Sequence, residues 1–176
     1  MKQLKKIHFA VYVELGLIFA IALFWGWRIH YGGADIYSVS DESFYLSLPF
    51  RLVKGDCLFL DETNTAQMFA FLMYPVLWLW LLLHNGSTEG IILSFRFLWL
   101  IAHLLISTGI FGICAKKKHW VSGCIASCLY ALSLPFLIAA FSYNTIALAC
   151  ASILAVLLYF DIRSVFSDLL SGFSTN

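Results

Sequence analysis

Five apolar segments follow one another along the chain, at residues 9–31, 67–84, 91–114, 119–141 and 145–160. The long polar stretch of the chain lies between residues 32 and 66. A helix that crosses a bilayer needs about 20 consecutive apolar residues, so each of the five segments is a candidate span. The pattern predicts a membrane protein built from helices.

Basic residues decide which segments are expected to cross. Lysines precede the first segment, and a second lysine cluster follows at 116–118. Both clusters should face the cytoplasm, which demands an even number of crossings between them. Segment 67–84 is expected to stay outside as a juxtamembrane helix, because it is short, contains Pro75, and carries the interfacial aromatics Trp78 and Trp80.

The expected fold is therefore all-α, a polytopic membrane helical bundle with about four transmembrane helices in a single domain over residues 1–176. The first span is interpreted as an uncleaved signal anchor, so the amino terminus is cytoplasmic and the plasma membrane is the expected location. The expected elements are spans 9–31, 91–114, 119–141 and 145–160, with an external loop 32–90 that contains juxtamembrane helices 41–54 and 67–84.

Composition agrees with this fold, since 61% of the residues are hydrophobic and only 12% are charged. The net charge of +1, with no basic stripe, excludes a nucleic-acid partner. The five cysteines form no C-x-x-C spacing and are expected to pack as small hydrophobic groups.

Two stripes of small residues should let the last two spans approach closely: Gly123, Ser127 and Ala131, then Ala147, Ala151 and Ala155.

An acidic pair, Asp41 and Glu42, opens the first predicted helix of the external loop. Phe44, Leu48 and Leu52 follow at a spacing of four, which predicts an amphipathic helix on the membrane surface. Two interpretations stay open, because the pair can cap this helix or carry chemistry. Adjacent carboxylates on a helix point about 100° apart, so the spacing does not support a divalent metal site, and no cofactor is assigned.

Two further charges lie inside apolar segments. An arginine within a span usually faces a partner or a polar cavity, so Arg96 should pair with Glu89, with another carboxylate of the external loop, or with a ligand. Glu14 lies near the inner end of the first span and is expected to snorkel towards Lys5 or Lys6 in a structural role.

The order of these motifs resembles the amino-terminal part of the GT-C membrane glycosyltransferases, the superfamily of protein O-mannosyltransferases and aminoarabinose transferases. The matching motifs are Asp41-Glu42 with Tyr45, Arg51 to Asp56, Gln67 ahead of an aromatic segment through Pro75, and Glu89-Gly90 with Arg96. The resemblance covers nearly the whole chain.

The resemblance implies transfer of a sugar, with inversion, from a polyprenyl-phosphate donor to an acceptor on the outer face. Asp41 matches the catalytic base of the family, with Glu42 as its supporting neighbour. Cations should stabilise the leaving phosphate. The expected substrate-binding residues are Arg51, Lys54, Glu62, Gln67, Arg96, Tyr143 and Asn144.

Two departures from the family pattern leave a second interpretation open. Many relatives place another acidic residue where this chain has Ser142-Tyr143-Asn144, and they carry about twice as many helices. The sequence therefore looks like a truncated transferase, which a second membrane chain could complete. The alternative is a non-catalytic small integral membrane protein, either a degenerate remnant or a subunit of a membrane complex.

Overall fold

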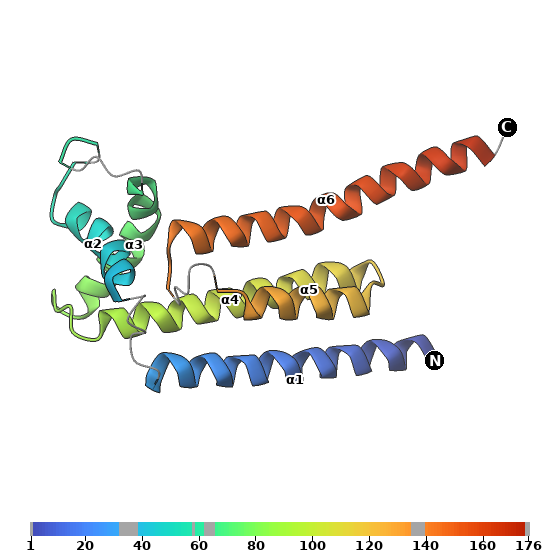
Figure 1. Cartoon of the computed structure of the whole chain (residues 1–176), viewed down its shortest axis with the longest axis horizontal. Helices are drawn as coiled ribbons and strands as arrows, with labels where there is room; N and C mark the ends of the chain where they lie inside the picture. Colours follow the sequence, from blue (N-terminus) through green and yellow to red (C-terminus); the bar gives the residue numbers. More distant parts are fainter. Residues whose placement is uncertain (1, 32–38, 58, 62–65, 135–139, 175–176) are drawn as a thin grey trace. The chain divides into compact units, whose positions relative to one another are not determined.

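The computed structural model describes the backbone of residues 2–31, 39–57, 59–61, 66–134 and 140–174, and the side chains of 9–31, 42–57, 59–61, 66–134 and 140–161. Within these residues the structure is helical and contains no strand (Figure 1). The helices are α1 (Lys2–Tyr31), α2 (Val39–Val53), α3 (Gln67–Leu83), α4 (Ile91–Lys116), α5 (Trp120–Leu132) and α6 (Tyr143–Ser174).

Three of these helices are long and apolar enough to cross a membrane. The apolar parts are Phe9–Tyr31 in α1, all of α4, and Tyr143–Asp161 in α6. Helices α3 and α5 are also apolar but shorter, with 17 and 13 residues. The predicted class, an all-α helical membrane bundle, is confirmed, while the number of crossings stays a prediction.

The prediction of a helix throughout residues 119–141 is wrong, because α5 ends at Leu132. Ser133 has an extended backbone, with φ of −71° and ψ of 135°. The sequence explains this end, since Leu134 precedes Pro135 and the residue before a proline is disfavoured in the helical conformation. A helix of 13 residues extends about 20 Å, which is less than the roughly 30 Å of a bilayer core.

Contacts divide the chain into two compact units. Unit 1 comprises Met1–Ile21, His103–Ser133 and Ala147–Asn176, and unit 2 comprises Ala22–Ala102 and Leu134–Ile146. Helices α1, α4 and α6 each contribute residues to both units. The single domain expected from the sequence stays a prediction.

In unit 1, small residues bring α5 against α4. Gly123, Ser127 and Ala131 are all buried. A Cβ atom added at Gly123 would lie 2.8 Å from Cβ of Cys114, so only a glycine permits this approach. The second predicted stripe is wrong, because α6 turns Ala149 into the core instead. The exposed residues of that stripe are Ala147, Ala151 and Ala155.

Hydrogen bonds also hold unit 1 together at a buried carboxylate. Glu14 is only 2% exposed and accepts a hydrogen bond from Oγ of Ser127. Oγ of Ser107 in turn donates to the backbone oxygen of Ser127 over 2.8 Å. The expectation that Glu14 snorkels is therefore wrong, because α5 supplies a hydroxyl partner inside the unit.

In unit 2, α2 packs against α3 through a face that includes Tyr45 and Leu48. Tyr45 and Leu48 are buried, whereas Phe44 is exposed and Leu52 is half-buried. Tyr45 packs with Phe69 of α3 in one core cluster. Of the three residues predicted to face the membrane, Leu48 packs inside the unit instead, so the inward face of α2 is centred about one residue, roughly 100°, from Phe44. Contact of Phe44 and Leu52 with the membrane stays a prediction.

The contact at Gly123 predicts a sharp difference between two glycine substitutions. Gly123→Ala should destabilise the protein by about 1–3 kcal/mol, because the new methyl group overpacks against Cys114. Gly112→Ala on α4 meets nothing within 4 Å, so the higher helix propensity of alanine should leave stability unchanged or raise it by up to about 1 kcal/mol. Denaturation in detergent micelles measures both, and equal effects of the two substitutions would contradict the close α4–α5 contact.

Candidate functional site

The candidate site centres on a buried ion pair between α2 and α4 in unit 2. Nε and Nη2 of Arg96 donate to the same carboxylate oxygen of Glu42, over 2.8 and 2.5 Å. The side chains of Arg96 and Glu42 are only 13% and 5% exposed. The prediction that Arg96 pairs with a carboxylate of the external loop is confirmed, and the partner is Glu42, while Glu89 is exposed.

The pair uses only part of the hydrogen-bonding capacity of the guanidinium. An arginine carries five N–H donors in a planar fork, and two of its nitrogens reach Glu42 here. Among the described residues, Arg96 makes no other hydrogen bond, and none of its nitrogens is both buried and unpaired. The remaining donors of Arg96 are therefore available to a ligand.

A cavity of about 590 Å³ adjoins Arg96, which is a size typical of small-molecule sites. Its walls combine hydroxyl groups with apolar side chains, and they come from α2, the start of α4 and the turn before α4. The lining residues are Ser43, Leu46, Ser47, Phe50, Thr88, Gly90, Ile91, Ile92, Leu93 and Arg96. Such walls suit a ligand with a polar head and an apolar tail.

The start of α4 adds a second positive feature to this cavity. Gly90 has a φ of +75°, a left-handed conformation that glycine adopts without strain, and the helix begins at the next residue. Gly90 and Ile91 both line the cavity. The positive end of the helix dipole and Arg96 therefore line the same cavity, and both favour a negatively charged group.

Glu42 lies on the other side of the pair. It lines a much smaller cavity of about 20 Å³, together with apolar residues that include Tyr45, Phe69 and Phe141. That volume holds about one water molecule. Arg96 lines the large cavity and Glu42 does not, so the cation is the member of the pair that a ligand in this cavity would contact.

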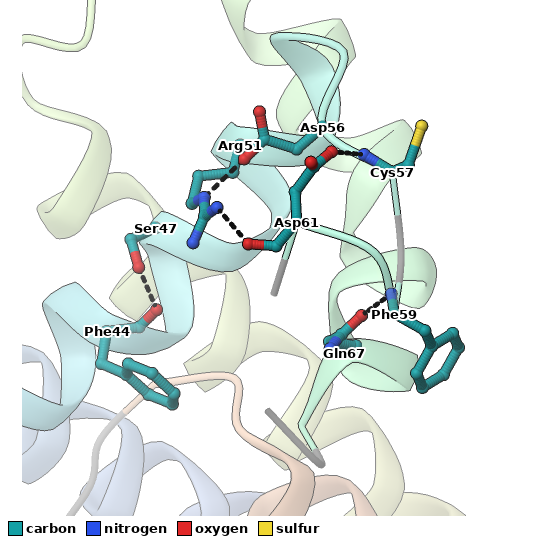
Figure 2. Close-up of polar contacts among 8 residues, drawn as sticks. All are labelled: Phe44, Ser47, Arg51, Asp56, Cys57, Phe59, Asp61 and Gln67. Atoms are coloured by element: carbon teal, nitrogen blue, oxygen red, sulfur yellow. Dashed lines mark hydrogen bonds and ion pairs between the residues drawn. The ribbon is translucent and has the colours of Figure 1, made fainter. Parts of the chain in front are cut away.

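Arg51 and Gln67, two other predicted binding residues, make hydrogen bonds with the segment between α2 and α3, which Figure 2 shows. Nε of Arg51 donates to Asp56 over 2.6 Å, and Nη2 donates to the backbone oxygen of Asp61 over 3.1 Å. The side-chain oxygen of Gln67 accepts a hydrogen bond from the backbone N–H of Phe59. Both residues organise the segment between α2 and α3, and neither lines the 590 Å³ cavity.

The other predicted residues are more dispersed. Nζ of Lys54 lies 5.3 Å from the ring centre of Phe50 and the residue is exposed. Tyr143 is 50% exposed and meets the ring of Tyr45 edge to face at 5.6 Å, and Asn144 is half-buried beside it at the start of α6. The backbone of Asp41 lies in the first turn of α2, but its side chain falls outside the described residues, as does all of Glu62.

Sequence reasoning missed the hydroxyl groups of Ser43, Ser47 and Thr88 in the cavity wall. The spacing of four between Ser43 and Ser47 places both on one face of α2, which is a signal that the sequence contained. No cluster of three or more metal-ligating side chains occurs in the described part of the chain.

Comparison with known proteins gives no match to this chain among family models, curated proteins or solved structures. A buried arginine, a helix start, hydroxyl groups and apolar walls together can hold an anion that carries an apolar chain.

The buried pair predicts strongly non-additive effects on stability. Arg96→Leu should cost about 3–5 kcal/mol, because it leaves the charge of Glu42 buried without a counter-charge. Adding Glu42→Leu to that variant should restore much of the loss, since no buried charge then remains. Chemical denaturation of the two single variants and the double variant in micelles measures this coupling.

Arg51→Leu is the matched control for this experiment. The side chains of Arg51 and Asp56 are 40% and 37% exposed, and an exposed pair contributes only about 0–1 kcal/mol. A double variant as unstable as the sum of its two single variants would show that Glu42 and Arg96 do not stabilise each other.

Proposed function

We propose that this chain is a GT-C-type membrane glycosyltransferase, which transfers a sugar from a polyprenyl-phosphate donor to an acceptor on the outer face of the membrane. The observation that supports the proposal is the 590 Å³ cavity with Arg96 in its wall. Its combination of one cation, three hydroxyl side chains and apolar residues matches the chemistry of a lipid phosphate.

Each part of the cavity has a role in this proposal. The apolar residues of α2 and α4, such as Phe50 and Ile92, contact the isoprenoid chain. Arg96 and the first turn of α4 bind the phosphate, and they stabilise the negative charge that grows on it as the sugar leaves. The hydroxyl group of Thr88 donates to a phosphate or sugar oxygen, and Oγ of Ser47, which donates to the backbone oxygen of Phe44 over 2.7 Å, accepts a hydrogen bond from a sugar hydroxyl.

Asp41 is the proposed general base, which takes the proton from the acceptor hydroxyl as its oxygen attacks the anomeric carbon. Its place in the first turn of α2, one residue before Glu42, supports this role. Glu42 supports it less well as a base, because its carboxylate already accepts two hydrogen bonds from Arg96.

A second candidate function rests on the same ion pair. A non-catalytic membrane protein would also need Glu42 to compensate the charge of Arg96, and the pairing of Arg51 with Asp56 is structural in either case. This candidate predicts that the cavity binds lipid phosphates without any transfer of sugar.

We further infer that the amino terminus faces the cytoplasm and that the protein lies in the plasma membrane. The lysines before residue 9 and those at 116–118 support this orientation, since cytoplasmic segments are enriched in lysine. The acceptor side of the proposed reaction is then the outer face.

Loss of the proposed base should remove transfer but not donor binding. Asp41→Asn keeps the size of the side chain, so the rate of transfer from a labelled polyprenyl-phosphate sugar should fall about 100-fold or more in membranes that contain the protein. Binding of the same donor should stay unchanged. Transfer at a normal rate by Asp41→Asn would refute the role of Asp41.

Two tryptophan substitutions test whether the donor binds in this cavity. One changes the cavity wall and the other is its control. Ser47→Trp places a large ring in the cavity wall and should abolish both donor binding and transfer. Ser87→Trp, at an exposed serine that does not line the cavity, should affect neither. Donor binding that survives Ser47→Trp would exclude this cavity as the donor site.

The orientation is tested by labelling single cysteines in intact cells. In a variant without its native cysteines, a cysteine at position 117 should resist a membrane-impermeant thiol reagent, because lysine-rich segments stay in the cytoplasm. A cysteine in place of Asn85, in the turn between α3 and α4, should react readily. Strong external labelling at position 117 would overturn the topology.

A further inference from the structure

An anionic ligand that enters the cavity meets an ion pair and not a lone cation. A phosphate that approaches Arg96 meets a guanidinium whose charge is already compensated by Glu42, over distances of 2.5 and 2.8 Å. Two opposite charges this close present almost no net charge to a third group. The site is therefore a weaker anion site than the arginine alone would make.

We propose that Glu42 is an internal counter-charge that lowers the affinity of the cavity for phosphate, so that a lipid phosphate is held loosely. This inference rests on the proposed function, which identifies the ligand as a lipid phosphate. Within that function it assigns Glu42 to the control of ligand affinity, and it predicts that a lipid phosphate product leaves the cavity readily.

Three observations support this assignment. Arg96 lines the large cavity, whereas Glu42 lines only the small one, so a ligand can reach Arg96 without displacing the carboxylate. Arg96 has donors that no described residue uses. Glu42 is only 5% exposed in its side chain, so water screens its repulsion of a nearby anion poorly.

The direction of the expected effect separates this proposal from the alternatives. If Glu42 only holds Arg96 in place, Glu42→Gln should weaken phosphate binding. If Glu42 is a counter-charge, the same substitution leaves a buried guanidinium without an anion, and phosphate should bind more tightly. Removal of a neighbouring like charge from a poorly screened site corresponds to a gain of about 10-fold or more.

The experiment measures equilibrium binding of radiolabelled farnesyl phosphate, a short isoprenoid phosphate, to the purified chain in detergent micelles. Glu42→Gln should bind this probe about 10-fold or more tightly than the wild type. Farnesol, which has a hydroxyl group in place of the phosphate, should bind equally to both proteins. Arg96→Leu should lose the preference for farnesyl phosphate over farnesol.

Glu89→Gln is the matched control, because Glu89 is an exposed carboxylate in the turn before α4, next to Thr88 and Gly90 of the cavity wall. Water screens its charge, so its removal should change the affinity for farnesyl phosphate less than twofold. A gain as large as that of Glu42→Gln would show a general effect of net charge and would overturn the proposal.

The failure of this inference is distinguishable from the failure of the proposed function. Arg96-dependent binding of farnesyl phosphate that is unchanged or weaker in Glu42→Gln overturns the counter-charge alone. Equal binding of farnesyl phosphate and farnesol by both the wild type and Glu42→Gln overturns the donor site as well. If Glu42→Gln does not fold unaided, recovery of folded protein with farnesyl phosphate but not with farnesol supports the proposal, and recovery with neither overturns it.

Discussion

A charged side chain in an apolar interior needs a partner, and in unit 2 this requirement joins Arg96 to Glu42, 54 residues earlier in the chain. The pair fixes the rotation of α2, because Glu42 points inward and Tyr45 and Leu48 follow on the same face. With α2 turned this way, Ser43 and Ser47 lie in the wall of the cavity beside α4. The proposed ligand site is thus a consequence of how one buried charge is compensated.

Unit 1 meets the same requirement with hydroxyl groups. The carboxylate of Glu14 accepts a hydrogen bond from Ser127, whose backbone oxygen is bound in turn by Ser107. The contact between α5 and α4 depends on Gly123, since a side chain there would collide with Cys114. In this unit one oxygen of the buried carboxylate has a hydroxyl partner, and among the described residues its other oxygen, Oε2, has none.

The sequence predicted the features that depend on local composition. The long apolar runs correspond to α1, α4 and α6. The position of Arg96 inside an apolar run predicted a carboxylate or a ligand as its partner, and the structure shows Glu42. The inward face of α2 could not be predicted, because the aromatic residues Phe44 and Tyr45 are adjacent and only the tertiary pairing of Glu42 decides between them. The early end of α5 had a signal in Leu134-Pro135, but hydrophobicity alone extended the predicted helix beyond it.

Burial is what separates two arginines that the family resemblance treats alike. Arg51 is 40% exposed and bound to Asp56, so water screens its field and its hydrogen bonds serve the local chain. Arg96 is 13% exposed and lies in the wall of a cavity, so its field and that of its partner Glu42 reach a ligand with little screening. The same side-chain chemistry therefore organises a loop at one position and, in the proposed function, contacts the ligand at the other.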